Sequence, residues 1–343
     1  MHASDEGEAP GDLRGMLEQA LARREELRSR LWLEGTDCYR IFHGVAEGRP
    51  GITVDRYGSL LLLQTFRDPL SPGEAHAIAD TIRDLLGEAL EFVWNHRGRG
   101  TPPGEMGTAS ARALAERTCR ENEARFLIRA RHRGQDPWLF LDMRSGRRLL
   151  QQIARGKTML NLFAYTCTAG IASALAGARE VVNVDFSESA LQIGRGNAAI
   201  NSIDKKTFKV LHSDCIPILR QIAGKPVQRR ERNHPYVVFP QREFDVIFLD
   251  PPRFSKGPFG AVDVVRDYPS LFKPALLALS GGGTILATNH VPGVDAKTWI
   301  DSLRRCAAKA GRPLASVELI GPDADFPSFD GAPPLKIALC RVP

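Results

Sequence analysis

Apolar residues recur at two different spacings along the chain. From Leu13 to Leu31 they lie three or four positions apart, which predicts one amphipathic helix. Over residues 35–105 they form short runs typical of strands, with one helical stretch that Ser71 is expected to start. We expect strands over 39–43, 51–55, 59–66 and 91–95, a hairpin turn over 55–58, and a helix over 75–86.

Beyond residue 142, strand patterns alternate with helix patterns. This alternation predicts a parallel sheet whose strands are joined by crossover helices. The last strand follows a hairpin-like stretch, so we expect it to run antiparallel. The fold class is therefore α/β, with a Rossmann-like sheet of seven strands, which we place over 159–162, 180–185, 208–212, 244–249, 283–288, 315–319 and 335–341.

The two patterns predict four segments. We expect a tail and amphipathic helix over 1–34, a smaller N-terminal α+β domain over 35–105, a connecting β-hairpin over 106–141 and the α/β domain over 142–343. The hairpin would pair a strand over 125–131 with a return strand over 138–141.

The composition, with 43% apolar and 25% charged residues, is ordinary for a globular protein. No apolar run approaches the roughly 20 residues of a membrane span, and the first residues do not resemble a secretory signal. The six cysteines are scattered, without the spacing of zinc ligands. We therefore expect a cytoplasmic protein that uses neither a membrane nor a metal.

Positive charge is concentrated in one part of the chain. Between Arg97 and Arg148 there are twelve arginines against six acidic residues, whereas the net charge of the whole chain is +6. The guanidinium group donates parallel hydrogen bonds to phosphate, so this stretch is either a nucleic-acid surface or a solvated basic face. The stretch 224–243 is also basic and is predicted to be a loop, with the same two interpretations.

Polar residues follow the first three expected strands of the α/β domain. The first strand leads into Asn161–Gly170, which lacks the glycine-rich GxGxxG pattern of dinucleotide enzymes. The second ends in Asp185, whose carboxylate can accept both hydroxyls of a ribose and would repel a 2′-phosphate. Asp214, after the third strand, can accept a hydrogen bond from the amine of adenine. Either aspartate is alternatively a helix cap.

The fourth strand end is the most specific. An apolar strand leads into Asp250-Pro-Pro-Arg-Phe254, where two prolines fix the backbone and aim carbonyl groups and a carboxylate at one place. Phe254 can stack on a base that has left its helix.

This last motif resembles the signature of class I methyltransferases that act on nitrogens of nucleic acids. The wider chain, over residues 35–340, resembles bacterial large-subunit ribosomal RNA methyltransferases. The stretches that carry this resemblance include 36–40 with 54–57, 139–144 with 147–148, 161–169, 265–267 and 282–289.

The resemblance implies a cofactor, a substrate and a set of site residues. The cofactor is S-adenosyl-L-methionine, and the partner is ribosomal RNA that is single-stranded or locally opened, with the domain over 35–105 facing it. Arg144 and Arg147 would cover the methionine end of the cofactor or hold phosphate. The implied catalytic residues are Asp250, Pro251, Phe254 and Asn289, and the implied cofactor-binding residues are Asn161, Phe163, Tyr165, Thr166, Asp185, Ser187, Asp214, Cys215, Arg144 and Asp250.

Two branches of that family differ in one residue. Methylation of cytosine C5 needs a thiolate that adds to C6, and the resemblance places that cysteine after the Gly-Gly-Thr strand. Here the position reads Ala287-Thr-Asn-His290. The chain is more similar to the guanine-N7 half of a bifunctional enzyme, which predicts methyl transfer to guanine N7 of large-subunit ribosomal RNA.

Several alternatives stay open at this point. The reacting atom is either N7 or an exocyclic amine, and His290 is either a general base or a solvated loop residue. The rival functions are cytosine-C5 methylation, RNA binding by an inactive methyltransferase fold, and nucleotide-dependent oxidation. The oligomeric state is open.

Overall fold

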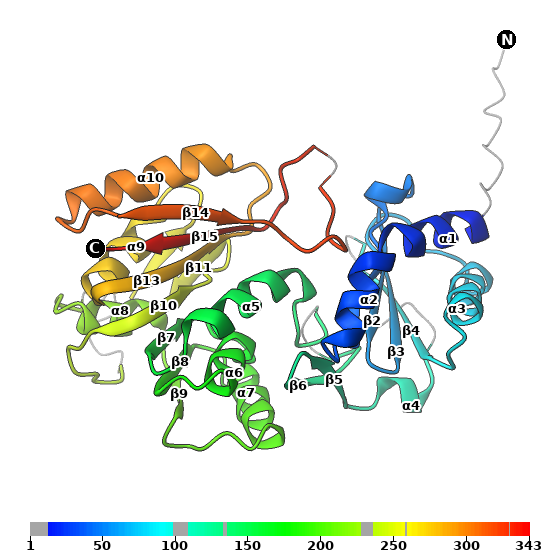
Figure 1. Ribbon diagram of the computed structural model, residues 1–343, viewed down its shortest axis with the longest axis horizontal. Coiled ribbons are helices and arrows are strands. Elements are labelled where there is room, and N and C mark those ends of the chain that lie inside the picture. Colours follow the sequence, from blue (N-terminus) through cyan, green and yellow to red (C-terminus); the bar gives the residue numbers. More distant parts are fainter. Residues whose placement is uncertain (1–12, 99–108, 133–135, 228–235, 258, 329) are drawn as a thin grey trace, which may run out of the picture. The chain divides into compact units, whose positions relative to one another are not determined.

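The computed structural model describes residues 13–98, 109–132, 136–227, 236–257, 259–328 and 330–343. The chain forms two compact units, each built on its own sheet (Figure 1). The smaller unit comprises Met1–Asn122, Ile128–Pro137 and Ala324–Pro327, and the larger comprises Glu123–Leu127, Trp138–Asp323 and Ser328–Pro343.

The smaller unit has a four-stranded sheet in the order β1-β2-β3-β4. The first three strands are antiparallel neighbours, and β4 runs parallel to β3 after a crossover through α3. Helices α1, α2 and α3 share one hydrophobic core with the sheet. Its elements are α1 (Leu13–Arg23), α2 (Glu25–Leu33), β1 (Cys38–Phe42), η1 (Val45–Glu47), β2 (Ile52–Tyr57), β3 (Leu60–Thr65), α3 (Pro72–Leu86), β4 (Glu91–His96), α4 (Ala111–Leu114) and β5 (Arg117–Glu121).

Helix α3 begins where its sequence predicts. The Ser71 hydroxyl accepts a hydrogen bond from the Glu74 N–H, and the Glu74 carboxylate accepts one from the Ser71 N–H, which together form a capping box. Gly87, in the left-handed conformation, ends the helix.

The single helix expected over residues 13–31 is wrong. It is two helices that meet at Arg24, whose backbone is not helical. The Arg24 side chain is only 1% exposed, and its guanidinium lies 2.8 Å from the Glu47 carboxylate. A buried ion pair of this kind leaves no trace in hydrophobic spacing, because both residues also fit a solvated helix face.

The larger unit has a seven-stranded sheet in the order β14-β15-β13-β10-β7-β8-β9. Strand β15 runs antiparallel to both of its neighbours, while β13, β10, β7, β8 and β9 are parallel, which confirms the expected sheet. Its elements are β6 (Ala124–Ile128), which crosses the unit boundary, η2 (Leu141–Met143), α5 (Arg144–Ile153), β7 (Thr158–Leu162), α6 (Thr168–Leu175), β8 (Glu180–Asp185), α7 (Glu188–Ile200), β9 (Phe208–His212), α8 (Cys215–Ile222), β10 (Phe244–Leu249), β11 (Phe254–Gly257), β12 (Gly260–Asp263), α9 (Pro269–Leu277), β13 (Leu279–Asn289), α10 (Ala296–Lys309), β14 (Ser316–Ile320) and β15 (Lys336–Arg341).

Helices cover both faces of this sheet. Leu160, Ile247 and Ile285 are register partners on β7, β10 and β13. They pack in one core with α8, α9 and α10. Helices α5, α6 and α7 gather on the opposite side (Figure 1). Burial on both faces explains why these strands are almost continuously apolar.

The expected connecting hairpin is only half correct. Its first strand is present as β6, but β6 pairs with the preceding strand β5. The expected return strand over 138–141 instead leads into the short helix η2. The observed turn is Asn122-Glu123, where Asn122 has a φ of 52°. The turn expected over 134–137 lies partly outside the described residues.

The register of the parallel strands aligns their carboxyl ends. Leu162 pairs with Val184 on one side and with Leu249 on the other, and Leu249 pairs with Ala287. The residues that follow these partners are therefore neighbours at one edge of the sheet. They are Phe163, Asp185, Asp250 and Thr288.

Within the described ranges, no helix is both long enough and apolar enough to cross a bilayer. The basic stretch 224–243 lies partly outside the described residues, because 228–235 are not among them.

Gly170 allows α6 to approach β8 closely. A Cβ atom at this position would lie 2.1 Å from Oδ1 of the buried Asn183, which holds an amide hydrogen bond from Asn161. We expect Gly170→Ala to destabilise the larger unit by about 1–3 kcal/mol, although alanine favours helix.

Urea unfolding of the two variants tests this expectation. Gly281→Ala is the control, because Gly281 has open space around its Cβ position and should change stability by less than about 0.5 kcal/mol. Equal stability of the two variants would show that α6 can shift without cost.

Candidate active site

A cavity of about 620 Å³ opens at the aligned strand ends of the larger unit. Aromatic side chains supply much of its wall, and the carboxylates at the ends of β8 and β10 reach it. It is lined by Phe140, Asp142, Met143, Arg147, Phe163, Ala164, Tyr165, Thr168, Ala169, Asp185, Phe186, Ser187, Phe248, Asp250, Pro252, Arg253 and His290.

The loop after β7 forms one side of the cavity without glycine. Phe163, Tyr165 and Cys167 have φ angles of 58°, 48° and 61°, in the left-handed region that side chains usually avoid. Such positions cost roughly 1–3 kcal/mol each and persist only where the surroundings enforce them. This conformation explains how the loop can lie against a ligand although it lacks the GxGxxG pattern.

Hydrogen bonds from neighbouring elements hold the loop in this shape. The Phe163 N–H donates to the Cys215 sulfur (3.2 Å), and the Tyr165 N–H donates to Asp185 (2.8 Å). The Thr166 hydroxyl donates to the Trp138 carbonyl (2.6 Å), and the Asn197 amide donates to the Thr166 carbonyl (3.0 Å).

Asp185 lies between two backbone donors at the end of β8. Its two carboxylate oxygens accept the Tyr165 and Ser187 N–H groups, each at 2.8 Å, and the residue is 4% exposed. Burial raises the pKa of Asp185, and the two N–H bonds partly oppose that rise. A carboxylate has about four acceptor positions, so Asp185 can accept two further donors from the cavity.

Asp250 and His290 both line the cavity, and Asp250 is also held by Thr288 in β13. Its Oδ1 atom accepts a hydrogen bond from the Thr288 hydroxyl and lies 2.6 Å from His290 Nε2. Burial acts to lower the pKa of His290, but the carboxylates of Asp250 and Asp142 outweigh it and raise that pKa above the ordinary 6.5. The pair therefore favours the protonated form of the imidazole.

Six of the sequence-predicted site residues line the cavity, namely Phe163, Tyr165, Asp185, Ser187, Asp250 and Arg147. Three others lie behind the lining and support it. The Asn161 amide donates to Asn183 (2.8 Å), while Thr166 and Cys215 make the loop contacts described above.

The remaining predicted residues lie outside the lining. Asp214 caps α8 by accepting the Ile216 N–H (2.8 Å), and Asn289 accepts the Val291 N–H (2.9 Å). Pro251 is buried, and Phe254 begins the β11–β12 hairpin with 59% of its surface exposed.

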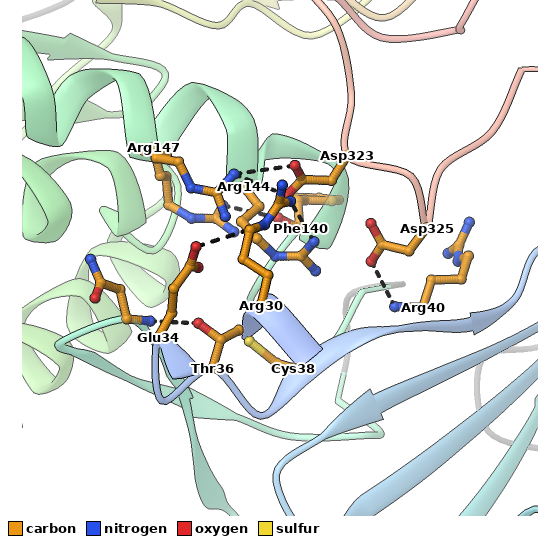
Figure 2. Close-up of polar contacts among 12 residues, drawn as sticks. Arg30, Glu34, Thr36, Cys38, Arg40, Phe140, Arg144, Arg147, Asp323 and Asp325 are labelled. Atoms are coloured by element: carbon orange, nitrogen blue, oxygen red, sulfur yellow. Dashed lines mark hydrogen bonds and ion pairs between the residues drawn. The ribbon is translucent and has the colours of Figure 1, made fainter. Parts of the chain in front are cut away.

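Arg144 and Arg147 are both 1% exposed, so neither belongs to an exposed basic face. Arg144 donates to the Asp323 carboxylate at 3.0 Å (Figure 2). Burial acts to raise the pKa of Asp323, but Arg144 and Arg148 lower it overall. Arg147 does reach the cavity, where it also donates to the Phe140 carbonyl (2.9 Å).

Sequence reasoning missed most of the aromatic wall. Phe140 packs beside Tyr165, with ring centroids 5.7 Å apart, and Phe186 is 62% exposed at the cavity. Both could have been found, because Phe186 directly follows Asp185 and Phe140 lies in the stretch 139–144. Phe248 could not, because it reads as an ordinary core residue of its strand.

One group of possible metal ligands lies in the smaller unit. Ligand atoms of Asp37, Cys38 and Cys119 are within 4.8 Å of one another. The Cys38 thiol donates to the Arg120 carbonyl (3.2 Å), and Asp37 accepts the Arg120 N–H (2.7 Å). Burial raises the pKa of the Cys119 thiol far above its usual value, which disfavours the thiolate that a metal would need at that residue.

The family model for S-adenosylmethionine-dependent methyltransferases matches residues 39–341 of this sequence. The chain belongs to this family. It is an enzyme that uses S-adenosyl-L-methionine, as the sequence predicted.

Named relatives agree with this assignment. Ribosomal RNA large subunit methyltransferase K/L of Chromohalobacter salexigens is 34% identical over 301 residues, which cover 84% of this chain but only 38% of that protein. Ribosomal RNA large subunit methyltransferase I of Aeromonas hydrophila is 28% identical over 324 residues, which cover 91% and 75%. The solved methyltransferase SMU.776, complexed with SAH, has a TM-score of 0.76 at 20% identity, covers 96% of this chain and 81% of its own, and so shares the fold.

The cavity fits this cofactor in three respects. Asp185 offers a buried carboxylate with acceptor positions for a ribose diol, and no ion pair of the described residues neutralises it. Phe163 and Phe186 offer apolar surface for adenine. Asp250 supplies negative charge toward a sulfonium at the other side.

Asp185→Asn should weaken S-adenosylmethionine binding by roughly 100-fold, because charge-assisted hydrogen bonds to the ribose are lost. Isothermal calorimetry measures this change. Glu188→Gln removes an exposed charge three residues away and should leave the affinity unchanged. Unchanged affinity in the Asp185 variant would contradict the ribose assignment.

The His290–Asp250 pair should make the stability depend on pH. Because the pKa of His290 is raised in the folded state, its stabilisation is fully present below the ordinary imidazole pKa and is lost as pH rises through the folded pKa. The difference in melting temperature between the wild type and His290→Gln should therefore shrink from pH 6 to pH 9. A difference that grows over this range would show that the histidine is neutral in the fold.

Proposed function

We propose that the enzyme transfers a methyl group to a base nitrogen of RNA, and that the nitrogen is guanine N7 of large-subunit ribosomal RNA. The carrying observation is that Asp250, followed by two prolines, and His290 both line the cavity, whose lining contains no cysteine among the described residues. The names of the two relatives support ribosomal RNA as the substrate class. The chain covers 38% of the K/L protein, so the activities of that whole protein are not carried over.

The burial of the thiols supports a nitrogen over cytosine C5. Cys167 and Cys215 lie close to the loop but are buried, and burial raises the pKa of both thiols. Cys340, in β15, has its pKa raised to about 12 for the same reason. A thiol that stays protonated cannot add to C6 of cytosine.

Guanine N7 needs little from the protein except position and charge. When bound, the cofactor supplies a methyl group on a positively charged sulfur. The N7 lone pair forms the new bond to carbon as the carbon–sulfur pair returns to sulfur, so no proton has to leave the base. Asp250 favours the positive charge that develops on guanine, and the apolar wall with Phe140 excludes water.

An exocyclic amine would use the same residues differently. The Asp250 carboxylate and the Pro251 carbonyl would accept its N–H groups and turn the nitrogen lone pair toward the methyl carbon. The product nucleoside separates this reaction from N7 methylation.

The surface features that support RNA contact lie near the cavity and along the basic stretch. Arg253 lines the cavity, and Phe254 is exposed directly after it. Phe254 is assigned here as a stacking surface for the displaced base. Arg120, Arg125 and Arg129, in the basic stretch between Arg97 and Arg148, are exposed and can meet phosphate.

The test is labelled methyl transfer to undermethylated large-subunit ribosomal RNA, followed by digestion and identification of the nucleoside. We expect 7-methylguanosine. A methylated exocyclic amine would retain the site and change the atom, whereas 5-methylcytidine would refute nitrogen methylation.

Asp250→Asn should lower the methyl-transfer rate by about 100-fold while cofactor affinity stays within a few-fold. Single-turnover rates and calorimetry measure the two effects. Asp301→Asn, on the exposed side of α10, is the control and should have no effect. Wild-type turnover in the Asp250 variant would place the active centre elsewhere.

A further inference from the structure

We propose that His290 is a positioning residue: it holds one oxygen of Asp250, together with Thr288, so that the other oxygen is presented to the base. The proposal rests on the proposed function, because it assigns Asp250 to the reacting side of the cavity. It gives His290 a role other than that of a general base.

The geometry of the three side chains carries this inference. Thr288 is the penultimate residue of β13 and His290 directly follows that strand, two positions later. Both can therefore reach Asp250, which directly follows the neighbouring strand β10. Both contact Asp250 Oδ1, the imidazole at 2.6 Å. No hydrogen bond among the described residues engages Oδ2, although Asp250 lines the cavity.

The charges around His290 argue against a base. The carboxylates of Asp250 and Asp142 raise the pKa of the imidazole, and Lys336 acts against them. Lys336 is itself held by the carbonyls of Val291 and Pro334, at 2.9 and 2.8 Å. The two carboxylates favour the protonated ring, and a protonated ring donates hydrogen bonds but cannot accept a proton.

A held carboxylate serves methyl transfer better than a rotating one. The terminal torsion of aspartate is broad, so an unrestrained carboxylate samples many orientations. Two donors on one oxygen remove this freedom before the base arrives. The remaining oxygen then meets an N–H or a developing positive charge without reorganisation.

Two substitutions at one position separate holding from proton transfer. His290→Gln keeps an N–H donor near the Nε2 position but provides no base, and His290→Leu removes both. We expect His290→Leu to lower kcat by roughly 10–100-fold, whereas His290→Gln should keep kcat within about fivefold of the wild type. The cofactor affinity should be unchanged in both variants. Equal losses of kcat in His290→Gln and His290→Leu would identify His290 as a base. A wild-type kcat in His290→Leu would show that His290 has no role. Either result overturns the proposal.

Thr288→Val tests whether the two donors act on one oxygen. The combined Thr288→Val/His290→Leu variant should differ from the product of the single effects on kcat, because both donors hold one group. Effects that multiply would show independent roles and contradict a shared one.

The orientation of Asp250 can also be observed without turnover. In crystals with S-adenosylhomocysteine, we expect one orientation of the Asp250 carboxylate in the wild type and in His290→Gln. In His290→Leu we expect this carboxylate to be rotated or to occupy two conformations. An unchanged orientation of the Asp250 carboxylate in His290→Leu would refute the proposal. This result is independent of the nucleoside, whereas a product of 5-methylcytidine would refute only the proposed function.

Discussion

The rest of the site depends on the two hydrogen bonds that the buried carboxylate of Asp185 accepts. It joins the end of β8 to the loop after β7 by accepting the Tyr165 and Ser187 N–H groups. Its desolvation is only partly offset by these two bonds, which is why its pKa is raised. A ribose diol would complete its hydrogen bonding, so the same carboxylate shapes the cavity and would attract the ribose of the cofactor.

The loop after β7, which Asp185 holds, shows how a backbone can lie close to a ligand without glycine. Three residues with side chains take left-handed conformations, each at an energetic cost. Bonds from Cys215, Trp138, Asn197 and Asp185 hold these conformations. Gly170 is needed only behind the loop, where Asn183 leaves no room for a Cβ atom.

The sequence predicted the architecture well because that architecture depends on local pattern. The strands 180–185, 208–212 and 244–249 were predicted to the residue, and strand ends place Asp185 and Asp250 at one edge in any parallel sheet. Asp185 and Asp250 therefore followed from spacing, and Ser71 followed from capping chemistry.

What could not be predicted depends on tertiary contacts. A run of arginines reads as a charged surface, yet Arg144 and Arg147 are both buried, and Arg144 pairs with Asp323, which is distant in sequence. Asn161, at a strand end, was expected to meet the cofactor, but its amide binds Asn183. The contact of Thr288 and His290 with Asp250 requires the pairing of β10 with β13, which only the fold supplies.

The most direct test of the whole account is a structure of the enzyme with S-adenosylhomocysteine bound. The account predicts that both ribose hydroxyls donate to Asp185 and that the sulfur faces the side formed by Asp250 and His290. A nucleoside bound away from Asp185, or a sulfur that faces away from Asp250, would contradict it.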